Sequence, residues 1–193
     1  MNSRLACQIL TDRTFVCTES QTAFLKTYLI LSPTQVIEYA KQLRQPFPEG
    51  EQAVSNNHKL AYHYAAAIRS RFPLGEPAIA RHARYSLFYA LNVIKDRFEL
   101  GEPTIAKDLD CAFAYAKTVI HGRFELGEPT IAKDADKSVK YAFEVLKGRF
   151  ELGEPTIKND PSLANQYAKF FKLNDFVDWK KELRNKFSPN AKE

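Results

Sequence analysis

Residue types that build metal sites and disulfide frameworks are scarce in this chain. Its 193 residues include three cysteines and four histidines, and Cys7, Cys17 and Cys111 stand far apart with no CxxC pair. That spacing argues against a disulfide framework and a structural zinc site, and it predicts a reducing compartment. The sequence also contains neither an HExxH motif nor a GxxxxGK[ST] phosphate loop. We therefore expect a protein that is not an enzyme and that uses no metal or cofactor.

Long apolar segments are absent as well. No apolar run approaches the ~18 residues that a membrane-spanning helix requires, and the opening stretch MNSRLACQILTDRTFVCTES lacks the apolar region of a signal peptide. Hydrophobic residues still make up 45% of the chain, which is enough for a buried core and argues against disorder. These features predict a folded cytoplasmic protein without a membrane partner.

The basic charge of the chain is confined to its two ends. Residues 1–44 carry five Lys/Arg against three Asp/Glu, and residues 158–193 carry eight against five. Residues 45–157 hold fifteen of each sign, so the net charge of +5 lies outside them. A groove that follows a phosphate backbone would place its excess along the repeats instead. Solvated terminal helices are the favoured explanation of the charge.

The most prominent feature of the sequence is an internal repeat. The dipeptide Tyr-Ala recurs six times at steps of 25 or 26 residues, which places six repeats within residues 32–173. Its copies are Tyr39-Ala40, Tyr64-Ala65, Tyr89-Ala90, Tyr115-Ala116, Tyr141-Ala142 and Tyr167-Ala168. The phrase RFELGEPTI also occurs three times, at residues 97–105, 123–131 and 149–157.

Each tyrosine lies within a predicted helix, because apolar residues around it recur at three- and four-residue spacing. Seven residues before the tyrosine stands a residue that favours N-caps, except in the third repeat, which has His82. These predicted N-caps are Ser32, Asn57, Asp108, Asp134 and Asp160. Pro33 and Pro161 suit the first helical position, and Ser32 with Gln35 forms a capping-box pattern.

The ends of these helices are predicted from glycine and proline. Gly122 and Gly148 follow the last apolar residue and predict left-handed C-caps, with Asp96 in the same place in the third repeat. The proline of each Gly-Glu-Pro triplet is compatible with a helix only in its first turn, so it predicts the start of a second, shorter helix. These prolines are Pro103, Pro129 and Pro155.

A pair of helices in about 26 residues cannot bury its apolar stripe alone, whereas stacked neighbours can. The sequence therefore predicts an all-α fold, a short α-solenoid of about six helix-pair repeats. We expect residues 1–31 to form an N-terminal cap, residues 32–173 the repeat array, and residues 174–193 a C-terminal cap helix and tail.

The stretch YAKTVIHGRFELGEPTIAKD (residues 115–134) resembles a tandem helical repeat of uncharacterised large double-stranded DNA bacteriophage and giant-virus proteins. The motif has the form YA-x-x-VI-x-GR[FW]-x-x-x-EP-x-I, and the resemblance covers residues 45–157. The first repeat departs from it, because RQPFPEGEQAV contains no Glu-Pro. The resemblance implies a helical repeat of viral origin, acting in the host cytoplasm, and it supplies no catalytic residues.

Comparison of the six copies separates constant columns from variable ones. We expect packing from the small residues three before the tyrosine and from the alanine after it. The columns one before and two after the tyrosine differ from repeat to repeat, as residues that contact different parts of a partner would. The candidate partner-binding face comprises Arg84, Phe88, Leu91, Lys95, Lys117, Lys140, Phe143 and Lys147. Free drift of solvent-exposed positions is the competing explanation, and the large apolar residues in the set argue against it.

Four arginines recur once per repeat, at Arg71, Arg97, Arg123 and Arg149. Guanidinium groups at regular steps could hold phosphates. Glutamates in the same phrase and the matched charges of the repeats instead favour an internal Arg–Glu ladder that links the repeats.

The leading hypothesis is a non-enzymatic repeat scaffold that binds a protein partner, as a phage-encoded modulator or inhibitor of a host protein. One alternative is an RNA or single-stranded DNA binding module in which Asn92, Thr118 and Glu144, three residues after their tyrosines, read one base per repeat. The other is a self-associating virion or assembly component.

Overall fold

The computed structural model describes residues 32–173, and every regular element in that range is a helix. The chain divides into two compact units, Met1–Ile105 and Ala106–Glu193. The predicted terminal caps, residues 1–31 and 174–193, lie outside the described residues.

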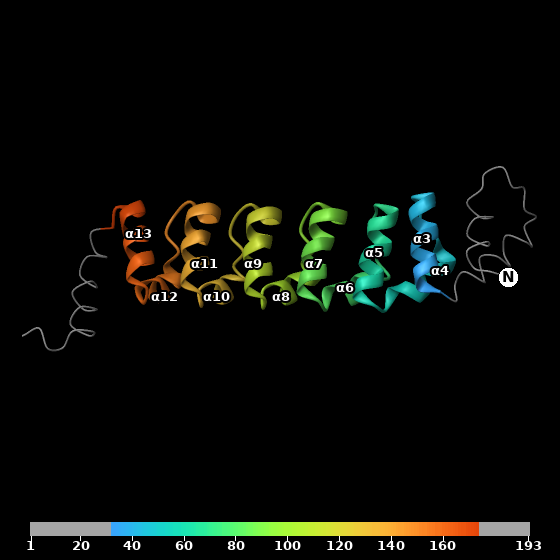
Figure 1. Ribbon diagram of the computed structural model, residues 1–193, viewed down its shortest axis with the longest axis horizontal. Coiled ribbons are helices and arrows are strands. Elements are labelled where there is room, and N and C mark those ends of the chain that lie inside the picture. The colour runs from blue at the N-terminus through green and yellow to red at the C-terminus, as the bar shows by residue number, and fades with distance from the viewer. Residues whose placement is uncertain (1–31, 174–193) are drawn as a thin grey trace, which may run out of the picture. The chain divides into compact units, whose positions relative to one another are not determined.

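In the first unit, longer helices that carry the tyrosines alternate with short connecting helices. The elements are α3 (Pro33–Leu43), α4 (Pro48–Ser55), α5 (His58–Ile68), α6 (Glu76–Ala80), α7 (Ala83–Tyr89), η1 (Ala90–Ile94), η2 (Glu99–Gly101) and α8 (Glu102–Ile105). Helices α3, α5 and α7 lie side by side, and the short helices lie near one end of them (Figure 1).

The second unit repeats this alternation. Its elements are α9 (Leu109–Tyr115), η3 (Ala116–Ile120), α10 (Glu128–Ile131), α11 (Ala135–Lys140), η4 (Tyr141–Leu146), η5 (Glu151–Gly153), α12 (Glu154–Lys158) and α13 (Pro161–Phe171). Helices α9, α11 and α13 lie side by side, and α10 and α12 connect them (Figure 1). Within each unit, successive helix pairs therefore stack neighbour on neighbour. The predicted all-α class of solenoid type is confirmed.

The predicted helix starts are confirmed in most repeats. Asn57, Asp108, Asp134 and Asp160 each accept hydrogen bonds from backbone N–H groups in the first turn of the helix that follows. Pro33 and Pro161 occupy the first helical position. The predicted capping bond of Ser32 is not formed, because its hydroxyl lies 3.2 Å from the Thr34 hydroxyl instead. The prolines of the Gly-Glu-Pro triplets lie in the first turn of α8, α10 and α12, as predicted.

The predicted C-caps are wrong. Within residues 32–173 no glycine has a positive φ, and the left-handed residue stands one position earlier, at Lys95 (φ 58°), His121 (φ 54°) and Lys147 (φ 51°). A left-handed conformation costs a non-glycine residue roughly 1–2 kcal/mol. A cation at a helix C-terminus recovers about 0.3–1 kcal/mol through the helix dipole. The charges of Lys95 and Lys147 therefore offset part of the conformational cost that glycine would have avoided.

A local widening of the helix explains why some steps are 25 residues and others 26. In α5 the N–H of the cap residue Arg69 bonds the Ala65 carbonyl, four residues back. In the 26-residue repeats the helix ends in a π turn, where Lys95 N–H bonds the Ala90 carbonyl, five residues back. Each of these repeats therefore accommodates its extra residue between the tyrosine and the cap, and the next repeat stays in register.

Candidate partner-binding site

Each arginine of the ladder binds a glutamate of its own repeat. Arg123 Nε and Nη2 donate to the two carboxylate oxygens of Glu128, at 2.9 and 3.4 Å. The other pairs are Arg71–Glu76, Arg97–Glu102 and Arg149–Glu154. The glutamate that Arg123 binds lies five residues further along the chain, so this ion pair lies within one repeat and does not itself link two repeats.

The link to the next repeat passes through a buried tyrosine. Tyr141 O–H donates to Glu128 Oε1 at 3.1 Å and accepts a hydrogen bond from Phe124 N–H at 2.8 Å. Tyr64, Tyr89 and Tyr167 make the equivalent pair of contacts. This role of the tyrosines was not predicted, although the constant 17-residue step from phenylalanine to tyrosine is visible in the sequence.

These contacts shift the pKa values of the groups that make them. Burial, together with the negative charge of Glu154, raises the pKa of Tyr167 to about 12. The hydrogen bonds to Glu128 raise the pKa of Arg123. The Arg123 side chain nevertheless stays 59% exposed, while the Glu128 side chain is only 10% exposed. The carboxylate is therefore the buried member of the pair, and the guanidinium covers it from the solvent side.

In the first unit, the structure brings part of the predicted face together. The Arg84 guanidinium lies 5.9 Å from the centre of the Phe88 ring, and Tyr62 of α5 contacts the same ring with centroids 6.1 Å apart. Leu91 is half-buried on η1, and Lys95 is the exposed left-handed cap of that helix. Tyr62 was not among the predicted residues, and it extends this aromatic surface onto the neighbouring repeat.

In the second unit, the predicted lysines contact acidic side chains. Lys117 pairs with Glu144 at 2.7 Å, and Lys140 pairs with Asp136 at 2.6 Å. Lys147 is exposed at its left-handed cap. The two ion pairs are exposed, so each contributes little to stability and partly neutralises this face.

Phe143 does not point freely into solvent. Its ring stacks on Phe170 of α13 with centroids 4.2 Å apart, and it also contacts Phe171 at 5.5 Å. Phe143 therefore packs against the next tyrosine-bearing helix, and Phe170, which is 58% exposed, presents the apolar surface there.

The residues proposed to read bases are engaged within the protein. Asn92 Nδ2 donates to the Tyr62 hydroxyl at 3.1 Å, and the Thr118 hydroxyl donates to the Ala114 carbonyl at 2.6 Å. Glu144 accepts from Lys117. A base would have to compete with these contacts.

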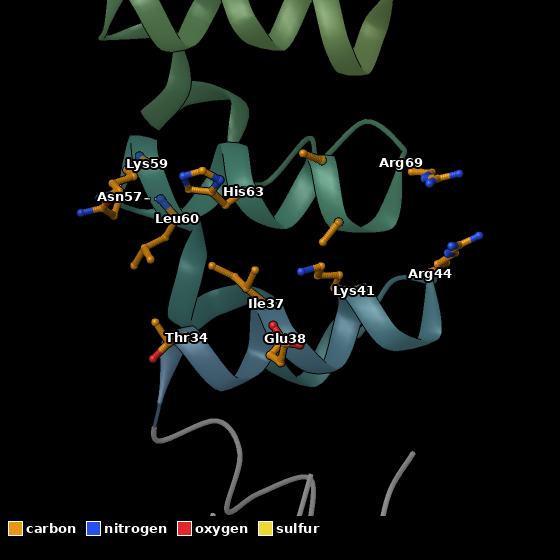
Figure 2. A pocket seen from close by; sticks show the side chains of 12 residues that line it. Thr34, Ile37, Glu38, Lys41, Arg44, Asn57, Lys59, Leu60, His63 and Arg69 are labelled. Carbon is orange, nitrogen blue, oxygen red and sulfur yellow. Dashed lines mark hydrogen bonds between the residues drawn. The ribbon is translucent and has the colours of Figure 1, made fainter. Parts of the chain in front are cut away.

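A groove of about 850 Å³ lies between α3 and α5, next to the predicted face (Figure 2). Its lining residues are Thr34, Ile37, Glu38, Lys41, Arg44, Asn57, Lys59, Leu60, His63, Ala66, Ala67 and Arg69. Several belong to the same variable columns as the predicted residues, one before and two after the tyrosine. Arg44 and Arg69 lie at one end of the groove, whereas Asn57 and Lys59 lie at the other (Figure 2).

The residue that ends each tyrosine-bearing helix is basic in all six repeats. These left-handed caps are Arg44, Arg69, Lys95, His121, Lys147 and Lys172. Lys95 and Lys147 belong to the predicted face on other grounds, but the basic column itself was not predicted. The one-residue difference between repeats hides it, because the cap lies five residues after the tyrosine in some repeats and six in others.

Two histidines stack at the N-termini of α5 and α7. The rings of His58 and His82 are 4.6 Å apart, and Tyr85 contacts both. Partial burial lowers the pKa of His58, and the positive charges of His82 and Arg81 lower it further. Between residues 32 and 173 no group of three or more His, Cys, Asp or Glu side chains is placed to hold a metal ion.

The fold and this site define an all-α helix-pair repeat protein with an exposed face that varies between repeats. None of the helices between residues 32 and 173 combines the length and apolar character needed to cross a bilayer. Comparisons with protein-family models, with curated proteins and with solved structures found no match.

Proposed function

We propose that this chain is a non-enzymatic repeat scaffold that binds a protein partner through the exposed face of its tyrosine-bearing helices. The observation that carries the proposal is the difference between the constant columns of tyrosines and small residues, which are buried, and the variable columns, which lie on the exposed face. The constant residues are used inside the fold: the tyrosines and the small residues three before them are buried, and the constant glutamates bind arginine and tyrosine. The residues of the exposed face instead differ from one repeat to the next.

The face offers the chemistry that protein interfaces use. Aromatic and arginine side chains, here Tyr62, Phe88 and Arg84, are enriched where protein partners bind. An aromatic cluster beside a basic groove gives one partner both apolar anchors and charged contacts. The resemblance to phage and giant-virus repeats supports a more specific role, as a phage-encoded modulator or inhibitor of a host protein.

Affinity purification from bacterial lysate with matched variants tests this proposal. Phe88→Gln removes an aromatic anchor and is compatible with the fold, because Gln166 occupies the same column in the sixth repeat. Leu100→Gln is the control, since Leu100 is 55% exposed but lies in a constant column. We expect the wild type and the control to recover the same protein, with recovery reduced about tenfold for Phe88→Gln. Recovery of nucleic acid alone would overturn the proposal.

Nucleic-acid binding is the second candidate, and the basic column at the helix C-caps favours it. Basic residues at the same cap position of every repeat, five of them Lys or Arg, would suit a ligand with regular negative charge. This candidate predicts that affinity for a labelled single-stranded RNA falls steeply and linearly with the logarithm of salt concentration. Absence of binding at low ionic strength would remove it. An apparent molecular mass from light scattering that rises with protein concentration would instead support a self-associating assembly component.

A further inference from the structure

The groove between α3 and α5 is open because of the side chains that face it. Between α5 and α7, the rings of Tyr62 and Phe88 contact each other. In the second unit, Phe143 and Phe170 stack between their helices. Between α3 and α5, by contrast, Ala66 and Ala67 stand where later repeats carry Leu91 and Asn92 or Phe143 and Glu144. Small side chains at these positions leave the groove unfilled.

Four cations and one carboxylate line this groove. Lys41, Arg44, Lys59 and Arg69 contribute the positive charges, and Glu38 is the single acidic side chain in the lining. None of the four cations forms an ion pair with another described residue, unlike Lys117 and Lys140 of the second unit. The positive potential of the groove is therefore not neutralised from within the described chain, and it favours a negatively charged ligand.

The middle of the groove is apolar. Ile37 of α3 points toward α5, and Leu60 lies opposite it on α5 (Figure 2). Both side chains are half-buried, as are Ala66 and Ala67. An apolar strip between two basic ends matches a ligand with an apolar centre and acidic flanks. The lining contains no phenylalanine, tyrosine or tryptophan on which nucleic-acid bases would stack, which favours a peptide over RNA.

We propose that this groove binds an acidic amphipathic helical segment of the partner protein. The inference rests on the proposed function and names the chemistry of the partner. Arg44 and Arg69 lie at one end of the groove and Lys59 lies at the other, so a helix that lies along the groove matches this charge pattern when acidic side chains stand near both of its ends. Apolar side chains on the same face of that helix insert between Ile37 and Leu60. This is recognition of a helix in a groove.

The probe is a fluorescent peptide of about 20 residues, long enough to form a helix in isolation, with leucines on one face and glutamates beside them. Fluorescence anisotropy measures its binding to the full chain. Ala67→Phe fills the groove without changing the charge, and the fold tolerates phenylalanine in this column at Phe170, which packs against the preceding tyrosine-bearing helix. Arg44→Gln with Arg69→Gln removes two positive charges. We expect each variant to weaken binding about tenfold or more.

The matched control is Lys107→Gln with Lys133→Gln, which removes the same charge from two exposed side chains outside the groove and outside the predicted face. It should leave peptide affinity within about twofold of the wild type. Equal losses in the control and the groove charge variant would overturn the inference, as would unchanged binding by Ala67→Phe. Stronger binding of a labelled single-stranded RNA that displaces the peptide would also overturn it.

One comparison separates failure of this inference from failure of the proposed function. If the protein captured from lysate is lost with Phe88→Gln but retained with both groove variants, a partner exists and binds elsewhere on the face. That result removes the groove proposal and leaves the scaffold proposal in place. Loss of the captured protein with the groove variants, together with peptide binding, supports both.

Discussion

At the scale of single residues, a buried hydroxyl group ties one repeat to the next. The side chain of Tyr141 donates to a carboxylate and accepts from a backbone N–H, and both partners belong to the preceding repeat. The ring itself is fully buried and contacts Phe150 of its own repeat with centroids 4.9 Å apart. The tyrosine column therefore combines apolar packing with polar contacts that specify how neighbouring repeats align.

Replacing Tyr141 with phenylalanine keeps the ring and removes only the hydroxyl group. Phe124 N–H and the buried Glu128 carboxylate each lose a partner, so we expect the free energy of unfolding to fall by about 1–3 kcal/mol. Thermal or chemical unfolding measures the loss. Tyr62→Phe is the control, since its hydroxyl bonds Asn92 at an exposed site, and it should change stability by about 0.5 kcal/mol or less. Equal effects of the two changes would contradict this role of Tyr141.

Replacing Arg123 with alanine should lower stability and leave partner affinity nearly unchanged. Glu128 would keep its buried carboxylate without its guanidinium partner, at a cost of about 1–3 kcal/mol. Lys133→Ala is the matched control, because it removes one charge from an exposed side chain that forms no ion pair with a described residue. Unaltered melting of the Arg123 variant would instead favour a phosphate-binding role for the arginines.

At the scale of elements, the two glycines of the fourth repeat, Gly122 and Gly127, have different roles. Gly127 precedes α10, and a Cβ atom there would lie 2.5 and 2.8 Å from carbons of the Phe124 ring and 3.1 Å from Ala112 Cβ. Gly122 follows the cap of η3, and the nearest atom to a Cβ there is the Ile120 carbonyl oxygen at 4.0 Å. The constant glycine of the Leu-Gly-Glu phrase thus permits the close approach of a phenylalanine ring.

We therefore expect opposite outcomes for two Gly→Ala changes in one repeat. Gly127→Ala should destabilise by about 1–3 kcal/mol through overpacking. Gly122→Ala should be neutral or stabilise by up to about 1 kcal/mol, since its φ is not positive and the unfolded chain loses freedom. Chemical denaturation of both variants compares them directly. A larger loss at Gly122 would show that glycine is needed as the cap after all.

The π turns predict that one residue can be removed without loss of the fold. Deleting Thr118 converts the fourth repeat to the length of the second, and Ile120 then takes the place that Ile68 occupies in α5. We expect a folded, cooperative protein with a melting temperature lowered by only a few degrees, about 1 kcal/mol in stability.

Deleting Ala66 from α5 is the control for this deletion. That helix contains no extra residue, so the change displaces the buried Ile68 and the cap Arg69 from their positions. Circular dichroism and thermal melting should show a large loss of stability for this variant alone. Equal tolerance of both deletions would contradict the interpretation of the π turn as an absorbed insertion.

At the scale of the whole molecule, the buried tyrosine contacts recur in both units, and together they contribute to the stability of the chain. Repeat proteins gain stability from each contact between neighbouring repeats. Among the described residues, Tyr64, Tyr89, Tyr141 and Tyr167 have clearly raised pKa values. Burial is the largest cause in each case. Deprotonation of these tyrosines would therefore destabilise several repeats over the same pH range.

The raised pKa values of these tyrosines predict unfolding at alkaline pH. The folded-state pKa values lie above the ordinary value of about 10, so the unfolded chain releases these protons first. Stability is then complete below pH 10 and falls as pH rises above it, by about 1.4 kcal/mol per pH unit for each tyrosine. Denaturation midpoints across this range measure the slope, and the tyrosinate absorbance of these four buried tyrosines should appear together with unfolding. Tyr89→Phe should make the slope shallower, and an unchanged slope would contradict the assignment.

Residues close together in the chain determined much of this protein by themselves. The 25- and 26-residue period, the caps at Asn57 and Asp134, and the proline-started second helices were predicted correctly, because propensity and capping act within one or two turns. The tertiary structure decided the contacts between repeats, which these local signals do not specify. The tyrosine hydroxyl meets a carboxylate of the previous repeat, the π turns place the cap before the glycine, and two alanines of α5 leave a basic groove against α3. Each depends on which side chains neighbouring helices bring together, and local sequence preferences do not specify that.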